Sequence, residues 1–428
     1  MSSRFLRATY AGLWFALTGF AQVSLFPTGD PQGASPQADP PQADVSRLTV
    51  ISGADARSSL GASVSLGDDG GLGSAGIGGF GNAGKQAGAS LPSWTYTVKA
   101  SQDGRTYSGK IVGANPSSTT PASVPVTLVP VVFKITQGGH AYTFDPTQVD
   151  AGCLGSGNAA FALTQHSPMF SSTSFAINGQ NINNTTFGDA FLQAEFWNLA
   201  GSSRKSLLAL GTPAIGSTLT ISVNAGTRGN STATVFAASG QCGNGLLAVV
   251  NINTVDAALQ NYISSHGLNA AQFPFFVTYN AVMSVGSASN LNNCCVLGYH
   301  NALGSPGQTY GIAEFEGRNQ TLFGGVADVS SASHEVNEWI NDPSGTNPTP
   351  AWGNIGQVSG CQNNFEVGDP LSGTLMPTIT QSGFTYHLQE SAFYSWFYGG
   401  SSLGTGGKYS SNGTFKGSAK LCPPGGTN

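Results

Sequence analysis

Residues 330–343 read S-S-A-S-H-E-V-N-E-W-I-N-D-P. Proline cannot continue a helix and restricts the residue before it, so the stretch predicts a helix over 330–341 that ends before Pro343. Residues four positions apart project from one face of a helix. His334 and Glu338 are therefore expected to lie side by side.

An imidazole and a carboxylate placed this way can coordinate one metal ion. Both groups suit Zn²⁺, and Glu335 lies beside them, where it could deprotonate a water molecule bound to the ion. This is the logic of the H-E-x-x-H motif with glutamate in place of the second histidine. The pattern predicts zinc ligands at His334 and Glu338 and a catalytic base at Glu335. Because glutamate is common on helix surfaces, a solvated helix face is the alternative.

A third metal ligand is expected downstream. Six of the seven glutamates follow residue 313, in a chain with few charges, and one of them lies in F-E-V-G-D-P at 365–370. A following helix or loop could return Glu366 to the helix, so it is the preferred ligand. Asp369 is the alternate ligand or a partner of His334. Gly-Asp-Pro also favours turns, so the segment could instead be only a polar turn.

Two further histidines are candidate catalytic groups. His300 lies in L-G-Y-H-N and His387 in T-Y-H-L-Q-E. Either could supply an acid or a hydrogen-bond donor to an oxyanion. The tyrosines that precede them, Tyr299 and Tyr386, could be the donors equally well. Each histidine could also be an ordinary surface or packed side chain.

These motifs together resemble a known family. G-Y-H-N-A, Y-G-I-A, S-H-E-V-N-E-W-I-N-D-P, P-A-W-G and E-V-G-D are similar to segments of exported bacterial proteins related to the plant EXORDIUM or phosphate-induced proteins. The resemblance covers about residues 270–400. It implies secretion and a zincin-like helix, without an established substrate. Cys361 precedes E-V-G-D here, whereas the family pattern has a cysteine after it. The positions that match the family motif are His334, Glu335, Glu338, Glu366 and Asp369.

The N-terminal region predicts export. Arg4 and Arg7 precede an apolar run that is too short to span a membrane, and small residues follow it, so residues 1–21 are predicted to be a signal peptide. Residues 22–91 are rich in Pro, Gly and Ser and are predicted to be a disordered linker. We therefore expect a secreted protein, extracellular or periplasmic, with no membrane span.

The amino-acid composition limits the classes of binding partner that can be expected. Charged residues make up 9% of the chain and the net charge is -5. Nucleic acids and anionic membranes need basic patches, so neither is an expected partner. The six cysteines of an exported chain are expected to form disulfide bonds, with metal binding as the rival interpretation. Cys294 and Cys295 are adjacent and are expected to bond to two different cysteines.

The predicted fold class is α+β. Residues 92–250 are expected to be β-rich, with strands from Trp94 to Val98 and from Val124 to Ile135, a helix over 187–199, and a strand pair at 219–223 and 232–236. Residues 251–428 are expected to be a zincin-like α+β region that carries the metal site. Helices are expected near 254–263, at 330–341 and over 389–398, with a strand over 273–282. The two regions could also form one domain.

Three functions compete. The first is a secreted zinc-dependent hydrolase, most simply a peptidase, that acts on an extracellular polypeptide or a cell-wall substrate. The second is a non-catalytic secreted or wall-associated protein with a structural metal or none. The third is a glycoside hydrolase that uses two of the clustered glutamates.

Overall fold

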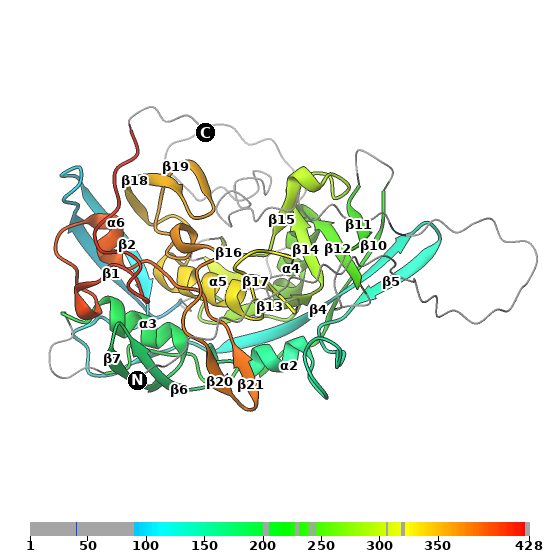
Figure 1. Ribbon diagram of the computed structural model, residues 1–428, viewed down its shortest axis with the longest axis horizontal. Coiled ribbons are helices and arrows are strands. Elements are labelled where there is room, and N and C mark those ends of the chain that lie inside the picture. The colour runs from blue at the N-terminus through cyan, green and yellow to red at the C-terminus, as the bar shows by residue number, and fades with distance from the viewer. Residues whose placement is uncertain are drawn as a thin grey trace, which may run out of the picture. The chain divides into compact units, whose positions relative to one another are not determined.

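The computed structural model describes Pro40 and residues 90–199, 205–226, 231–238, 242, 245–304, 307–317 and 322–423. The predicted signal peptide and nearly all of the predicted linker lie outside these residues. The described chain is a mixed α+β structure, as the sequence predicts (Figure 1). Its helices are α2 (Ala160–Gln165), α3 (Phe187–Glu195), α4 (Ile252–Ser265), α5 (Ser330–Asn341) and α6 (Tyr394–Tyr398), with short 3-10 helices η3 (Leu291–Asn293), η4 (Asp369–Leu371) and η5 (Thr405–Gly407). Its strands are β1 (Ser93–Lys99), β2 (Thr106–Val112), β3 (Ala122–Ser123), β4 (Val126–Gln137), β5 (His140–Phe144), β6 (Thr173–Ile177), β7 (Gln180–Thr185), β8 (Leu208–Ala209), β9 (Ala214–Ile215), β10 (Leu219–Asn224), β11 (Ala233–Ala237), β12 (Leu246–Asn251), β13 (Phe273–Tyr279), β14 (Ala281–Ser284), β15 (Cys294–Val296), β16 (Gly298–Leu303), β17 (Gln308–Phe315), β18 (Pro348–Ile355), β19 (Val358–Asn364), β20 (Ile379–Gln381) and β21 (Phe384–Tyr386).

The main sheet has the strand order β10-β4-β13-β17-β16, with β5 and β9 also paired to β4. Strands β10, β4, β13 and β17 run parallel, and β16 pairs antiparallel with β17 at the end of this order. Strand β4 comes from the first half of the chain and lies beside β13 from the second half. The two predicted regions therefore share one sheet.

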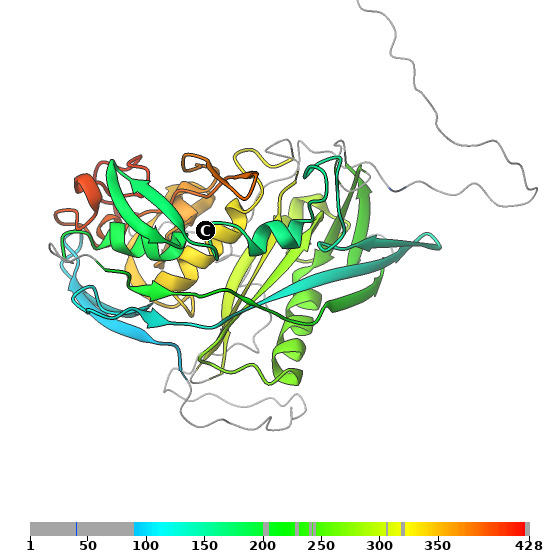
Figure 2. The same ribbon diagram turned by 90° about the horizontal axis from the view of Figure 1, so that it is seen from below.

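Each face of the main sheet has its own core. Phe273, Phe275 and Val277 alternate along β13 and pack with α5 on one face. Phe276 points to the other face, where it meets α4 and a second sheet of order β11-β12-β14-β15. Figures 1 and 2 show α5 and α4 on these two sides. Helix α5 therefore packs its apolar side on β13. Its polar side faces β16, at the end of the same sheet, and the segment around η4.

Trp339 connects α5 to the sheet. Its indole is stacked on the ring of Phe273, with centroids 3.7 Å apart and an interplanar angle of 12°. Its Nε1 donates a hydrogen bond of 3.0 Å to Thr309 Oγ1 on β17. Buried tryptophans usually find such a partner for the N–H group. These contacts fix the rotation of α5 and hence the direction of the His334 and Glu338 side chains.

All six cysteines form disulfide bonds. Cys153 pairs with Cys242 and Cys361 with Cys422, and the adjacent Cys294 and Cys295 pair with each other. The expectation that Cys294 and Cys295 bond to different cysteines is wrong, because the other four cysteines are already paired among themselves. The Cys361 bond ties the segment after α6 to β19.

Several predicted elements differ from the structure in their partners or ends. Strands β10 and β11 exist, but β10 pairs with β4 and β11 with β12, so they do not form the expected pair. The expected strand over 273–282 is two strands in different sheets, separated at Asn280, whose φ is 54°. The expected helix over 389–398 is limited to α6. No helix in the described ranges has the length and apolar character needed to cross a membrane.

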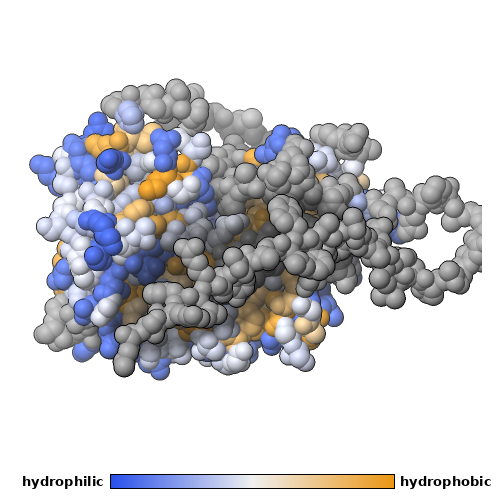
Figure 3. All heavy atoms as spheres, in the orientation of Figure 1, coloured by the Kyte–Doolittle hydropathy of each residue, from blue (hydrophilic) through white to orange (hydrophobic). Residues whose placement is uncertain are grey.

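The surface reflects the low charge of the sequence. On the face drawn in Figure 3, the strongly hydrophilic side chains gather mainly over the half that holds β1, β2, β18 and β19. Pale and apolar residues lie between them. This distribution fits a chain in which only 9% of residues are charged.

Candidate metal centre

Helix α5 is buried along its whole length, including its polar side. His334 is 5% exposed, Glu335 3% and Glu338 0%. The solvated helix face that the sequence left open is therefore not what the structure shows. Buried charged groups are costly unless they are paired or coordinate a metal, so the surroundings of these side chains decide what they can do.

The first group of possible ligands consists of His334, Glu338 and Asp369. One ligand atom from each lies within 4.8 Å of the others. Nε2 of His334 is 3.1 Å from Glu338 Oε1 and 3.4 Å from Asp369 Oδ1. The i, i+4 spacing on α5 produces the first contact, and η4 brings Asp369 to the second. An imidazole with two carboxylates is a donor set that suits Zn²⁺.

The start of η4 orients the Glu338 carboxylate, and the hairpin of β18 and β19 orients the Asp369 carboxylate. The backbone N–H groups of Gly368 and Asp369 each donate a 3.1 Å hydrogen bond to Glu338 Oε1. The carboxylate of Asp369 accepts hydrogen bonds from the amides of Gln357, at 2.5 Å, and Gln362, at 3.0 Å. Such outer hydrogen bonds hold metal ligands in position.

The other side of the His334 ring is held by Gln389. Its Nε2 lies 2.8 Å from His334 Nδ1, a contact in which the ring tautomer determines the direction of the hydrogen bond, and it donates a 2.9 Å hydrogen bond to the carbonyl of Gly368. An added Cβ at Gly368 would lie 2.6 Å from His334 Nδ1, so only glycine leaves room for the ring. Burial opposes protonation of His334, but the negative charges of Glu338, Asp369 and Glu335 outweigh it and raise its pKa well above the usual value. The carboxylates around His334 thus favour the protonated, positively charged ring.

A second group overlaps the first. It consists of His300 on β16 with Glu335 and Glu338 on α5, again with ligand atoms within 4.8 Å of one another. His300 Nδ1 is 3.3 Å from Glu335 Oε2 and 3.8 Å from Glu338 Oε2. An added Cβ at Gly298 would lie 2.8 Å from Glu335 Cγ, so β16 approaches α5 closely here. The two groups share Glu338.

Glu366 and His387 lie differently from the other predicted residues. Glu366 is outside both groups, with Oε2 3.9 Å from His300 Nε2 and Oε1 accepting from Asn364 Nδ2 at 2.8 Å. His387 Nδ1 lies 2.5 Å from Asp328 Oδ2. It lines a cavity of about 260 Å³ together with Asp328 and Glu316. Of the predicted residues, His300, His334, Glu335, Glu338 and Asp369 form the cluster, and the catalytic and metal-binding roles of all seven stay predictions.

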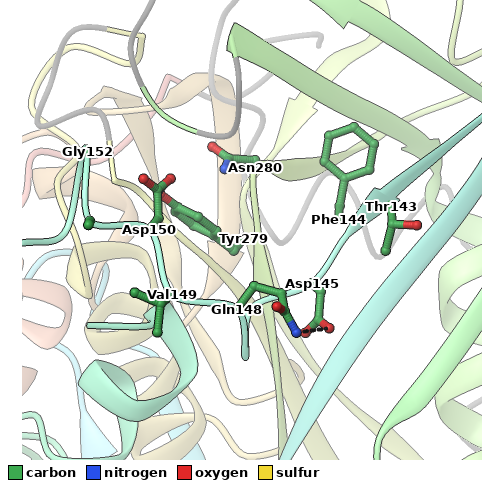
Figure 4. Close-up of a pocket in the computed structure, with 10 residues that line it drawn as sticks. Thr143, Phe144, Asp145, Gln148, Val149, Asp150, Gly152, Tyr279 and Asn280 are labelled. Carbon is green, nitrogen blue, oxygen red and sulfur yellow. Dashed lines mark hydrogen bonds between the residues drawn. The ribbon is translucent and has the colours of Figure 1, made fainter. Parts of the chain in front are cut away.

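A larger cavity of about 500 Å³ lies at the ends of β5 and β13. Figure 4 shows Asp150 and Tyr279 close together and Asn280 beside them on its wall. Tyr279 donates a 2.9 Å hydrogen bond to Asp150. None of the cluster residues lines this cavity, so it is a separate feature.

Sequence reasoning missed three supporting residues. Gly298 and Gly368 let the backbone approach the cluster, and Gln389 holds His334. A glycine before Asp369 and another before the Y-H-N segment were visible in the sequence. Both stand in the motifs G-Y-H-N-A and E-V-G-D, but the sequence did not indicate that their missing side chains make room for the cluster.

Comparison with known proteins adds no relative. No protein-family model, no curated protein and no solved structure matches this chain. The resemblance to EXORDIUM-like proteins therefore stays a prediction.

Proposed function

We propose that the protein is a metal-dependent hydrolase of the exported kind, with Zn²⁺ held by His334, Glu338 and Asp369. The observation that supports this most is the convergence of three ligand atoms within 4.8 Å in a buried place. Asp369 takes the position of third ligand, for which the sequence favoured Glu366, because of these two candidates only Asp369 is grouped with His334 and Glu338. When bound, zinc would lower the pKa of a water molecule and polarise a carbonyl group.

Glu335 is the base in this proposal. Its Oε1 lies 4.0 Å from His334 Nε2, beside the place where the ligands converge. A carboxylate there can accept a proton from a water molecule held between the ligands and the substrate. His300 faces the same carboxylate from β16 and can orient it. The substrate class that we propose is an extracellular polypeptide or a cell-wall component.

A structural metal is the second candidate. The near-complete burial of His334, Glu335 and Glu338 supports it, because structural zinc sites are closed whereas catalytic sites keep an open position. The glycosidase hypothesis receives less support. The clustered carboxylates surround two imidazoles instead of facing each other across a groove.

Three proteins separate these functions: wild type, His334→Ala and Glu335→Gln. A hydrolase predicts that wild type binds zinc and cleaves members of a mixed peptide library, and that His334→Ala loses zinc. Glu335→Gln removes basicity at constant size, so hydrolysis should fall by about 10²–10⁴-fold while metal stays bound in the His334 site. A structural metal predicts that His334→Ala lowers thermal stability and that Glu335→Gln changes no activity. Wild type that binds no metal after exposure to zinc, manganese and calcium contradicts both.

A further inference from the structure

The second ligand group around His300 is not used by a single zinc ion. His300 is fully buried at 0% exposure and comes from β16, whereas Glu335 and Glu338 come from α5. Three ligand atoms from two elements thus meet at a place beside the first group. One contact with His300 is enough to orient Glu335 as a general base. The additional approach of His300 to Glu338 is not explained by that role.

The hydrogen bond of His300 determines which ring nitrogen faces the carboxylates as a ligand. Its Nε2 lies 2.9 Å from the carbonyl oxygen of Asp342, which can only accept a hydrogen bond. Nε2 therefore carries a proton, and in the neutral ring Nδ1 has the lone pair. Nδ1 lies 3.3 Å from Glu335 Oε2 and 3.8 Å from Glu338 Oε2, so it is the ring nitrogen that would bind an ion in place of a second proton. Three electron-rich atoms facing one point are suited to a cation, and metal-binding histidines commonly donate the other N–H to a carbonyl.

Glu338 faces both groups with different oxygen atoms. Oε1 lies 3.1 Å from His334 Nε2, and Oε2 lies 3.8 Å from His300 Nδ1. A carboxylate in this position can bridge two metal ions. Two-metal sites hold their ions about 3.5–4 Å apart, a separation that one bridging carboxylate spans.

We propose that the cluster is a dinuclear centre for two divalent transition-metal ions. His334, Asp369 and Glu338 Oε1 hold the first ion, and His300, Glu335 and Glu338 Oε2 hold the second. The proposal rests on the proposed function for the first ion only. The donors are imidazoles and carboxylates, which suit Zn²⁺, Mn²⁺, Fe²⁺ or Co²⁺.

The charges of the cluster agree with two ions. Glu335, Glu338 and Asp369 are ligands in this arrangement, and Glu366 lies 3.9 Å from the His300 ring. Four carboxylates can bring four negative charges, which two imidazoles alone cannot balance. Two divalent ions supply four positive charges. Glu366 then acts on His300 from outside, as carboxylates near metal-binding histidines do.

A second ion changes the role of Glu335. With one ion, both Glu335 oxygens are available to a water molecule. With two ions, Oε2 binds the second ion, and replacing Glu335 by glutamine weakens that site. Glu335→Gln therefore distinguishes the two arrangements by metal content alone, without any substrate.

The test is metal stoichiometry in full-length protein freed of metal and titrated with Mn²⁺, followed by elemental analysis after desalting. We expect two equivalents in wild type, one in His300→Ala and in Glu335→Gln, and two in the control His140→Ala, whose histidine lies on β5 away from the cluster. Two bridged Mn²⁺ ions couple magnetically, so the wild-type electron paramagnetic resonance spectrum should lack the hyperfine pattern of isolated Mn²⁺. This measurement needs no variant and is unaffected by any folding defect.

Three results would overturn the dinuclear centre. One equivalent in wild type, with unchanged content in His300→Ala and Glu335→Gln, leaves the single-ion function intact and removes the second site. Two equivalents with the spectrum of isolated ions places the second ion elsewhere on the chain. Absence of bound metal in wild type overturns both this inference and the proposed function.

Discussion

His334 Nε2 lies 3.1 Å from Glu338 Oε1, one turn further along α5. The same carboxylate oxygen accepts hydrogen bonds from two backbone N–H groups just before and within η4. Glu338 Oε1 is therefore positioned both by the spacing of residues on α5 and by the backbone at the start of η4. The consequence is that the direction of Glu338 depends on Gly368 and Asp369 as much as on α5.

Substitution of Gly368 should therefore weaken metal binding without removing a ligand. A methyl group at Gly368 would lie 2.6–2.8 Å from the atoms of the His334 ring and must displace it. We expect Gly368→Ala to bind zinc about 10–100-fold more weakly, the usual effect of disturbing the surroundings of a ligand. Zinc titration measures this. Gly324→Ala is the control, because a Cβ there meets nothing within 4 Å. Equal zinc affinity in Gly368→Ala and wild type would show that the ring position is irrelevant to binding.

Removing the Trp339 side chain should destabilise the fold. The indole is fully buried, stacked on Phe273 and hydrogen-bonded to Thr309. Large-to-small substitutions of this kind cost about 3–5 kcal/mol of the free energy of unfolding. Trp339→Phe keeps an aromatic ring but loses the N–H donor, so its loss should be smaller. Chemical denaturation of both variants checks the order, and a loss below about 1 kcal/mol in Trp339→Ala would contradict the role given to this contact.

The pair of His387 and Asp328 predicts a pH dependence of stability. The hydrogen bond to Asp328 raises the pKa of His387 above its ordinary value of 6.5, partly opposed by burial. A histidine with a raised pKa in the folded state stabilises fully below the unfolded pKa, and the contribution is lost as pH rises through the folded pKa. The difference in unfolding free energy between wild type and His387→Gln should thus shrink from about pH 5 to about pH 8. A difference that grows with pH would refute the pairing.

The three disulfide bonds predict almost no free thiol in unfolded, unreduced protein. Thiol titration that finds four or more free groups would contradict the pairing of all six cysteines. A specific variant tests one bond. The double substitution Cys361→Ser with Cys422→Ser removes a bond between cysteines that are 61 positions apart in the sequence. It should lower the free energy of unfolding by about 2–5 kcal/mol.

Local sequence signals predicted α5 well. They did not predict which strands pair or which residues meet through tertiary contacts. Pro343 and the i, i+4 pattern act within one helix, so the predicted helix over 330–341 agrees with the structure. The strand pattern of β10 identifies a strand but not its neighbour, because alternation defines faces and not partners. Asn280 interrupts an apolar run by adopting a positive φ, a conformation that asparagine adopts more readily than most residues, so the residue type was the one local signal of this break. Gln389 lies in extended chain because it contacts His334 and Gly368, a tertiary contact that overrides helix propensity.

In the candidate metal centre, too, local spacing was predictable from the sequence and long-range contacts were not. His334 and Glu338 could be placed together from their spacing alone. The choice between Glu366 and Asp369 depends on how the chain turns into η4, and the sequence could not determine that direction. His300 was a candidate without an assigned partner, and its contacts with Glu335 and Glu338 required β16 to lie against α5.

The most direct test of the central claim is a crystal structure of the zinc-treated protein with diffraction data collected at the zinc absorption edge. The account predicts an anomalous difference peak among His334 Nε2, Glu338 Oε1 and Asp369 Oδ1, about 2.0–2.2 Å from each ligand atom. Crystals that show these three side chains ordered, with no anomalous peak between them, would contradict the proposed metal centre.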